Sequence, residues 1–327
     1  MNYGSTGFGR LTQSVPAEIV LGVDGGGTKT RAVLADEQQN VLGEGIAGPS
    51  NPLRVGIGNA AAAIREAVDK ACAAASIQRA EIVGAEIGLA GVRRGDMRER
   101  MRETLTGLGI NSLEVVTDAD IALFGATNGE PGVVVISGTG SICCGANRSG
   151  RHKCAGGWGP VAGDEGSGLW IARRALQKIA QAADGRGHST SLTAAACNYF
   201  NIRSPEELST AIYAPDVTNE RIAGFARRVI EAAQSEDEAA REIITEAGRE
   251  LGAAAIAVIR SLHMERERFQ VAYVGGVFHA GELVLEPLRV EVARIAPRAF
   301  LAPPLITPAI AAARMAHAHL HPLALVG

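Results

Sequence analysis

The sequence has few aromatic residues, few cysteines and no long apolar run. Only 4% of its 327 residues are aromatic, and its five cysteines form no C-x-x-C pair. An odd number of cysteines without paired spacing fits a reducing compartment better than a disulfide framework, so we expect a cytoplasmic protein. The longest apolar stretches, such as residues 253–259, are far shorter than the roughly 20 residues that span a bilayer, and we expect no membrane segment.

A charge excess and a targeting signal are also missing. Lys and Arg number 32 against 35 Asp and Glu, a formal net charge of −3 that argues against a nucleic-acid-coating surface. Residues 1–16 form a polar leader without the apolar core of a secretory signal. Hydrophobic residues at 46% and charged residues at 20% are close to the average of globular proteins, and the length suggests two domains.

Glycine, in contrast, is abundant, with 40 residues. Such a number implies several places where the backbone must turn sharply or approach a ligand or another strand closely.

The first 120 residues alternate between strand and helix patterns. Three β-rich runs with tight connections, at 18–23, 31–36 and 41–48, predict an antiparallel meander. A helix is expected at 59–75 with Asn59 as its cap. Two further strands, at 81–92 and 112–119, flank a charged helix at 93–108, which is a βαβ pattern.

The beginning of the chain is repeated further on. Asp24 and Ser137 both end a buried strand, and the same offset of 137 − 24 = 113 places Gly27 on Gly140 and Thr28 on Ser141. In both copies a Gly-rich turn lies between two strands, which indicates a duplication. We expect an N-terminal domain over 1–130 and a C-terminal domain over 131–327, with the last residues packing back on the first.

The second copy continues into a mainly helical region before a late strand at 269–278. The expected helices lie at 167–183, 190–200, 205–213, 219–234 and 236–262, with one more from about Gly281. That late strand ends in Gly275 and Gly276, and a glycine pair between a strand and a helix makes room for a ligand.

The first Gly-rich turn has chemistry of its own. Gly25, Gly26 and Gly27 allow positive φ angles and let backbone N–H groups converge on an anion, and the Asp24 carboxylate can face a divalent metal. Phosphate with Mg²⁺ is the natural ligand, and a plain hairpin turn with an exposed Asp is the alternative. No Walker A pattern occurs. The second turn, Gly138-Thr139-Gly140, keeps the glycines without the carboxylate.

A set of motifs in the same order resembles a known family. VDGGGTKT, SNP at 50–52, TDA at 117–119, ISGTGS, GGWG at 156–159, GDEGSG at 163–168 and VGGVF are similar to the N-acetylglucosamine kinase-like branch of the BadF/BadG/BcrA/BcrD ATPase family. The resemblance covers nearly the whole chain. It implies an α/β fold of the actin/hexokinase/Hsp70 superfold, with two ribonuclease-H-like domains and an inter-domain nucleotide cleft. It also implies ATP-dependent phosphorylation of an amino sugar at its 6-hydroxyl.

Phosphoryl transfer to a sugar hydroxyl requires a group that accepts the proton. Asp118, at the end of a predicted strand, is the candidate, and it looks like the family's catalytic Asp. A helix-capping role for Asp118 is the structural alternative, and Asp120 is a weaker competitor.

Sugar recognition needs amides, carboxylates and an aromatic face, which Asn51, Asp164 and Trp158 offer. The resemblance places Asn51, Gly157, Trp158 and Asp164 around the sugar. Trp158 could alternatively fill the core, and Glu165 is expected to serve the first turn of the following helix.

The resemblance also assigns residues to the nucleotide. Thr28 and Thr139 resemble phosphate contacts, and Gly224, Gly275 and Gly276 resemble the lining of the adenosine pocket. Lys29 either contacts phosphate or points to solvent. Asp24 is the candidate for Mg²⁺, through water, because Mg²⁺ gives up its hydration reluctantly.

Two clusters are discounted. His317, His319 and His321 are spaced by two, and residues two apart on a helix do not face each other, so a shared three-His metal site is not expected. Cys143 and Cys144 point to opposite faces of a predicted strand and are expected to be buried thiols.

These observations predict a cytoplasmic ATP-dependent kinase of N-acetylglucosamine, with glucosamine as the nearest alternative substrate. Its partners would be ATP, Mg²⁺ and the amino sugar, and the resemblance favours a homodimer. The rivals are a nucleotide-driven ATPase acting on a protein partner and a sugar sensor without kinase activity.

Overall fold

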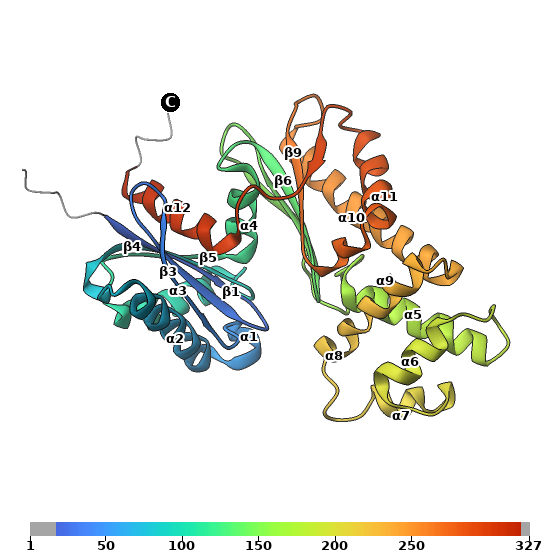
Figure 1. The fold of residues 1–327 in the computed structure, drawn as a ribbon. Helices are drawn as coiled ribbons and strands as arrows, with labels where there is room; N and C mark the ends of the chain where they lie inside the picture. The colour runs from blue at the N-terminus through green and yellow to red at the C-terminus, as the bar shows by residue number, and fades with distance from the viewer. Residues whose placement is uncertain (1–17, 322–327) are drawn as a thin grey trace, which may run out of the picture. The chain divides into compact units, whose positions relative to one another are not determined.

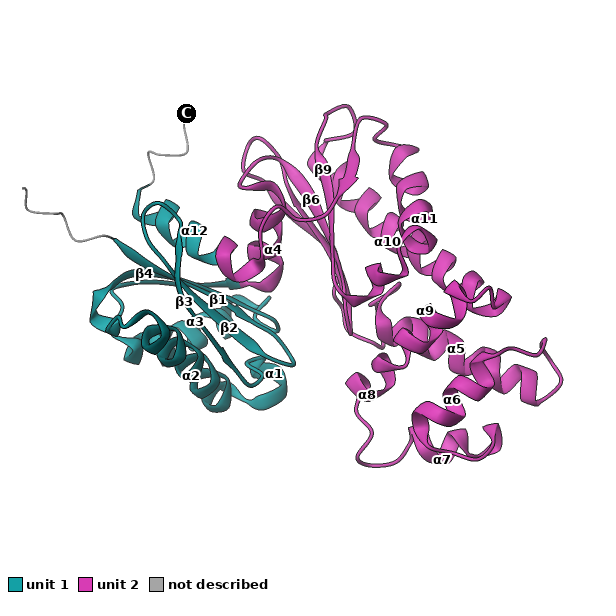
Figure 2. Cartoon of the chain, viewed as in Figure 1, with its two compact units in different colours: residues 1–116, 312–327 teal, residues 117–311 magenta. Residues whose placement is uncertain are grey.

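The structure is a computed structural model that describes residues 18–321 (Figure 1). The expected leader, residues 1–16, lies outside this range. The described residues form two compact units, the first up to Val116 and again from Ala312, and the second from Thr117 to Ala311 (Figure 2). The chain returns to the first unit at Ala312. Limits of independent domains at 1–130 and 131–327 stay a prediction.

The first unit is built on a five-stranded sheet in the order β3-β2-β1-β4-β5. Its strands are β1 (Ile19–Gly25), β2 (Thr30–Ala35), β3 (Val41–Ala47), β4 (Ile82–Leu89) and β5 (Ser112–Thr117). The first three form the expected meander, with β1–β2 and β2–β3 antiparallel, while β4 pairs with β1 in parallel. The run IVLGVDG forms the central strand because its residues are apolar on both faces and helices cover both.

One face of this sheet is covered by α2 (Ile57–Ala75), seen beneath the strands in Figure 1. Leu21 and Val23 join the alanines of α2 in one core. Gly43 and Gly45 of β3 make this approach possible, since a Cβ on Gly45 would lie 2.0 Å from the carbonyl oxygen of Ala67. These two glycines, in the middle of β3, therefore provide the space in which α2 packs against the strand.

The opposite face is covered by α12 (Pro308–Leu320), the last described helix. Ala313 and Ala316 pack with Val20 and Ala35, and a Cβ on Gly84 would lie 3.0 Å from Leu320. The first unit is thus completed by a segment that follows its own last strand by almost 200 residues.

The second unit repeats this topology. Its sheet has the order β10-β9-β6-β7-β8, the counterpart of β5-β4-β1-β2-β3. The strands are β6 (Gly132–Ser137), β7 (Ser141–Ala146), β8 (His152–Gly156), β9 (Gln270–Val274) and β10 (Phe300–Ala302). The antiparallel β6–β7–β8 meander and the parallel β6–β9 pair match the first sheet, so the duplication predicted from the sequence is confirmed.

Helices cover both faces of the second sheet. On one face α4 (Asp118–Thr127) packs on Val134 and Cys144, and on the other α10 (Glu238–Leu262) packs on Val133 and Cys143. Gly248 and Gly252 of α10 lie against α11 (Glu282–Ala293), where a Cβ on Gly248 would lie 2.5 Å from the carbonyl oxygen of Val284. The tight helix contact indicated by their spacing is present.

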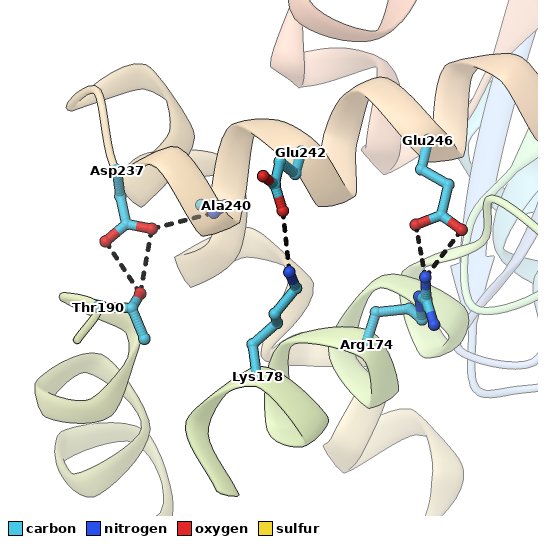
Figure 3. Close-up of polar contacts among 7 residues, drawn as sticks. All are labelled: Arg174, Lys178, Thr190, Asp237, Ala240, Glu242 and Glu246. Carbon is cyan, nitrogen blue, oxygen red and sulfur yellow. Dashed lines mark hydrogen bonds and ion pairs between the residues drawn. The ribbon is translucent and has the colours of Figure 1, made fainter. Parts of the chain in front are cut away.

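Two ion pairs join α10 to α5 (Gly168–Ala183) in the helical body (Figure 3). Arg174 Nη2 donates to both carboxylate oxygens of Glu246 at 2.8 and 2.7 Å, and Lys178 Nζ lies 2.8 Å from Glu242. Both pairs are partly exposed, so each stabilises the contact by only about 0–1 kcal/mol.

The remaining helices are close to the predicted ranges, with two differences. The expected helix over 219–234 is divided into α8 (Asn219–Gly224) and α9 (Ala226–Gln234), at a glycine that the Tyr199 hydroxyl approaches. Asn59 does not cap α2, which begins earlier, and its Nδ2 donates to Val55. The other helical elements are α1 (Pro52–Val55), α3 (Gly95–Leu105), α6 (Leu192–Phe200), α7 (Leu208–Ile212) and the short 3-10 turns η1 (Arg79–Glu81), η2 (Thr106–Leu108), η3 (Pro205–Glu207) and η4 (Gly276–Ala280).

The cysteine prediction is half right. Cys143 is a buried thiol, and burial raises its pKa far above the usual range. Cys144 is not a thiol, because it forms a disulfide with Cys154, its direct partner across the β7–β8 pair. The ten-residue separation gave no C-x-x-C signal, and only the strand register brings the two sulfur atoms together. Among the described residues, no helix is long and apolar enough to span a bilayer.

Candidate active site

The predicted site residues of the first unit gather at one edge of its sheet. β1, β3 and β4 run in the same direction, so their carboxyl ends meet at that edge. Backbone hydrogen bonds link the segments that leave it: Ala90 N donates to Gly25 O at 2.9 Å and Ser50 N to Gly26 O at 3.0 Å. In open α/β sheets this edge is where ligands bind.

The first Gly-rich turn spans residues 26–29, closed by a hydrogen bond of 3.0 Å from Gly26 N to Lys29 O. Gly25, Gly26 and Gly27 do not adopt positive φ angles, so the conformational reason expected for them is wrong. For Gly25 the reason is lack of space instead. A Cβ on Gly25 would lie 2.4 Å from both Leu89 Cδ2 and Ser50 Oγ.

A cation that the sequence analysis missed lies beside this turn. A Cβ on Gly27 would lie 2.9 Å from Arg54 Nη1, so the guanidinium of α1 rests against the turn. Thr28 and Lys29 are exposed, and their hydroxyl and ammonium groups are open to a ligand. Arg54 follows the SNP motif closely, and that position was the only signal that could have indicated it.

Asp24 lies at the end of β1, half-buried. Burial raises the pKa of its carboxyl, and the charges of Lys29 and Arg31 oppose the rise. A partly desolvated carboxylate at the mouth of a phosphate-type turn fits a hydrated Mg²⁺, which binds through one or two carboxylates and keeps several waters. The chemistry of the position therefore suits the metal expected there.

Asn51 lies at the same edge, as the N-cap of α1. Its Oδ1 accepts a hydrogen bond of 3.0 Å from Leu53 N and rests against Gly91, whose φ is +84° and where a Cβ would lie 2.3 Å from that oxygen. The carboxamide is held in one orientation, and its Nδ2 group can donate to a sugar hydroxyl.

The second unit has an equivalent edge, at the carboxyl ends of β6, β8 and β9. The second Gly-rich turn, residues 138–140, is closed by a hydrogen bond of 2.9 Å from Gly138 N to Gly140 O. The beginning of α5 is tied to it, since Gly168 N donates to Gly138 O at 2.8 Å and Leu169 N to Thr139 O at 3.2 Å. The turn is one residue shorter than the first, so the offset between the copies is 137 − 25 = 112 at the end of the first strand and 141 − 30 = 111 at the start of the next, in place of the constant 113 expected from the sequence.

Asp164 reaches this second turn from the loop before α5. Its side chain is buried, with the residue 9% exposed, its Oδ1 lies 3.4 Å from Ser141 N, and a Cβ on Gly140 would lie 2.8 Å from its Oδ2. The φ angle of Asp164 is +62°, a conformation uncommon for residues other than glycine and often kept for function. Asp164, which the resemblance assigns to the sugar, thus contacts the second Gly-rich turn, which is assigned to phosphate.

Trp158 is 71% exposed, which excludes the core-filling alternative. It follows Gly157, whose N–H donates to Ser141 O at 2.9 Å and whose φ of +70° turns the chain. The indole is therefore presented from a loop anchored on β7, as an aromatic surface for a sugar face would be. Glu165 is exposed, and its backbone oxygen accepts a hydrogen bond of 2.7 Å from Ser141 Oγ.

The glycines assigned to the nucleotide converge on the same edge. Gly275 has φ +120°, and a Cβ there would lie 2.1 Å from Ser137 O. A Cβ on Gly168 would lie 2.9 Å from Gly138 O and 3.4 Å from Ala223 O, next to Gly224. Gly224 and Gly276 are both exposed. Gly224 and the pair Gly275 and Gly276, which are far apart in sequence, thereby expose backbone without side chains, whereas Gly168 is buried.

Asp118 and Asp120 have different roles in α4. Thr117 is the N-cap, and Asp120 completes a capping box by accepting from Thr117 N at 3.0 Å and from Thr117 Oγ1 at 2.7 Å. Asp118 is the first helical residue, half-buried, with Oδ1 accepting from Ala119 N at 3.0 Å. The N-cap position is therefore held by Thr117 and not by Asp118, although the Asp118 carboxylate still accepts a hydrogen bond from a backbone N–H of the first turn.

The position of Asp118 follows from topology. A short connection joins the end of α4 to the start of β6, and a Cβ on Gly132 would lie 2.5 Å from Thr127 Cγ2, so α4 runs antiparallel to β6. The first residues of α4 consequently lie toward the end of β6, where Ser137 and the second Gly-rich turn are found.

A small cavity of about 200 Å³ adjoins this edge, lined by residues that include Ser141, Gly156, Glu165 and Glu250. Burial raises the pKa of Glu250, and the like charges of Glu165 and Glu246 add to the rise. Sequence reasoning did not single out Glu250, which lies on the inner side of α10.

The two related sheets, each with a Gly-rich turn after its first strand, define a protein of the actin/hexokinase-like fold. A glucokinase of the ROK family from Streptomyces griseus, solved with glucose and AMPPNP, shares that fold, with a TM-score of 0.58 and 21% identity over 91% of this chain and 99% of the other. The model of the BadF/BadG/BcrA/BcrD ATPase family matches residues 21–314, and the chain belongs to this family.

Relatives that are about 30% identical in sequence are named as kinases of amino sugars. An N-acetylmuramic acid/N-acetylglucosamine kinase from Clostridium acetobutylicum is 34% identical, with 80% of this chain and 85% of the relative covered. An N-acetyl-D-glucosamine kinase from Dictyostelium discoideum is 31% identical over 91% and 98%. A solved structure from Chromobacterium violaceum, assigned as an N-acetylglucosamine kinase, has a TM-score of 0.74 and 29% identity over 91% and 98%.

Proposed function

We propose that this protein is an ATP-dependent kinase that phosphorylates the 6-hydroxyl of N-acetylglucosamine, with Mg²⁺ as the metal. The observation that supports the proposal most is that Asp118 and Asp120, the two carboxylates at the start of α4, have different roles. Asp120 completes the helix cap, whereas the adjacent Asp118 is the first residue of α4, at the helix end that lies toward the carboxyl edge of the second sheet, and this position suits a general base.

In this reaction Asp118 accepts the proton of the attacking sugar hydroxyl. Asp164 and Asn51 hydrogen-bond sugar hydroxyls, and the exposed Trp158 ring packs against the C–H face of the sugar. The two Gly-rich turns direct backbone N–H groups and the Thr28 and Thr139 hydroxyls at phosphate oxygens, with Lys29 and Arg54 as nearby cations. Mg²⁺, when bound at Asp24 through water, supplies charge neutralisation for the phosphates. Gly224, Gly275 and Gly276 leave room for adenosine.

A coupled assay of ADP release tests the substrate. ATP and Mg²⁺ are supplied with N-acetylglucosamine, glucosamine or N-acetylmuramic acid in turn, and N-acetylglucosamine is expected to raise turnover most. Hydrolysis that no amino sugar stimulates would contradict the kinase and favour the ATPase acting on a protein partner.

Asp118→Asn tests the base. We expect sugar-dependent turnover to fall by about 100-fold or more, since general base catalysis contributes typically 10²–10⁴-fold, while sugar binding measured by calorimetry persists. Asp120→Asn is the matched control, and it should lower the melting temperature through the capping box with a much smaller loss of turnover. Equal losses in both variants would remove Asp118 from the mechanism.

The Cys144–Cys154 disulfide removes the cysteine argument for a cytoplasmic protein, so the proposed cytoplasmic site of action is supported by the use of ATP as phosphoryl donor alone. The resemblance that led to the kinase proposal favours a homodimer, which light scattering on the purified protein would test.

A further inference from the structure

The last described helix brings two histidines and a glutamate together at the surface of the first unit. His317 and His321 are four residues apart, and the hydrogen bond of 3.2 Å from His321 N to His317 O continues the helical pattern of α12. Residues at this spacing face the same side of a helix, and the two rings lie with centroids 4.9 Å apart.

The third group comes from the other end of the chain. Glu18, directly before β1, places its Oε2 2.6 Å from His321 Nε2. One ligand atom from each of Glu18, His317 and His321 lies within 4.8 Å of the other two. We propose that these three residues form a binding site for a divalent transition-metal ion, Zn²⁺ in the first place.

The chemistry of the three ligands favours Zn²⁺ over Mg²⁺ or Ca²⁺. Imidazole nitrogen and carboxylate oxygen are both Zn²⁺ ligands, at about 2.0–2.2 Å, whereas Mg²⁺ and Ca²⁺ prefer all-oxygen sites. Ligand atoms at those distances in a tetrahedron are about 3.3 Å apart. The distance from His321 Nε2 to Glu18 Oε2 is 2.6 Å and no two of the three ligand atoms are more than 4.8 Å apart, so small rotations of the side chains suffice to reach that value.

Solvent access agrees with a site that exchanges its ion. The side chains of His321 and Glu18 are 44% and 37% exposed, and three protein ligands leave the fourth tetrahedral position to water. His319, which lies between His317 and His321 in sequence, makes a different contact: its Nδ1 lies 2.9 Å from the fully buried carboxylate of Glu86. The three histidines therefore divide into a pair and a single residue, and only the pair enters the metal site.

The site has a structural consequence for the first unit. It would join the end of α12 to the start of β1, so the ion would hold the returning helix on the sheet that it covers. Binding of an ion to the folded form alone stabilises that form by mass action.

Titration calorimetry with ZnCl₂ on tag-free protein, stripped of metal, tests the proposal. We expect one Zn²⁺ per chain at this site and a rise of about 3 °C or more in melting temperature at saturation. His317→Gln and Glu18→Gln should each weaken binding by about tenfold or more, because even an outer-shell partner contributes about 10–100-fold to metal affinity. His319→Gln is the matched control and should keep the Zn²⁺ affinity.

Cobalt provides a second readout that is independent of stability and of kinase activity. Co²⁺ at this site should give visible absorption bands typical of nitrogen and oxygen ligands, lost in His317→Gln and without the thiolate band that binding to a cysteine would produce. Sugar-dependent ADP release should be unchanged in His317→Gln. Binding of Zn²⁺ with equal affinity by wild type, His317→Gln and Glu18→Gln, or no binding to the wild type, would overturn the proposal.

Discussion

At the scale of single residues, the two glycines that follow β9, Gly275 and Gly276, are needed for different reasons. At Gly275 the φ angle of +120° disfavours any other residue, and there is no space for a side chain, because an added Cβ would lie 2.1 Å from Ser137 O. Gly276 has no positive φ, and an added Cβ there would meet no atom within 4 Å. The fold therefore requires glycine at position 275, whether or not a ligand binds there, whereas at position 276 only a ligand would require it.

Gly275→Ala should therefore destabilise the second unit by about 3 kcal/mol or more, since backbone strain and a clash with a main-chain oxygen combine. Gly276→Ala should leave the melting temperature unchanged and raise KM for ATP, because the added methyl group occupies the surface assigned to adenosine. Thermal melts and ATP titrations of the two variants provide the comparison. An unchanged KM in Gly276→Ala would remove that residue from the nucleotide site.

At the scale of elements, the start of α10 depends on Asp237. Burial alone would raise the pKa of this carboxyl, but hydrogen bonds from Ala240 N, Ser191 and Thr190 outweigh it and hold the pKa below its usual value. The contacts to Thr190 Oγ1 at 3.0 and 2.9 Å and to Ala240 N at 2.9 Å are drawn in Figure 3. One side chain thus caps α10 and ties it to the segment that begins α6.

Asp237→Ala should lower the free energy of unfolding by about 1–2 kcal/mol near pH 7, the typical value of a helix cap. Because the folded-state pKa is lowered, the stabilisation is complete above the unfolded-state pKa and is lost as pH falls through the folded-state value. Urea unfolding at a series of pH values should show that the difference in free energy of unfolding between wild type and Asp237→Ala becomes smaller below about pH 4. Asp237→Asn keeps a cap without the charge, and its free energy of unfolding should lie between those of wild type and Asp237→Ala. A difference in free energy of unfolding that does not depend on pH would contradict the charge argument.

At the scale of the whole molecule, the first unit relies on a helix that follows the second unit in sequence. Ala316 of α12 is 3% exposed and packs among Val20, Ala35 and Ala313. These contacts cover the apolar face of β1 and β2 on this side, so the core of the first unit depends on α12.

Ala316→Asp should destabilise the first unit by about 3 kcal/mol or more, because it buries a charge in an apolar contact. Limited proteolysis followed by mass spectrometry should reveal cleavage within residues 18–116 before cleavage of the second unit. Ala74→Asp, at an exposed position of α2 in the same unit, is the matched control and should have little effect. Equal protease resistance of Ala316→Asp and wild type would show that α12 is dispensable.

Local patterns were sufficient for much of the architecture. Alternation and apolar runs located the three strands of the first meander and the two strands beside the second Gly-rich turn, but not β8. The repeated Gly-rich turn indicated the duplication that the two sheet orders confirm. These features depend on neighbours in sequence, since strand propensity, helix periodicity and tight turns are properties of short segments. Asp118 was also selected locally, as a carboxylate at the end of a strand.

Contacts between distant segments were decided only by the tertiary structure. Arg54 beside Gly27, Asp164 at Gly140 and the Cys144–Cys154 disulfide all depend on strand register or loop path. The pairing of His321 with Glu18 depends on α12 docking against β1. Residue spacing along the chain carries no direct information on such contacts, because register and docking result from packing the whole unit.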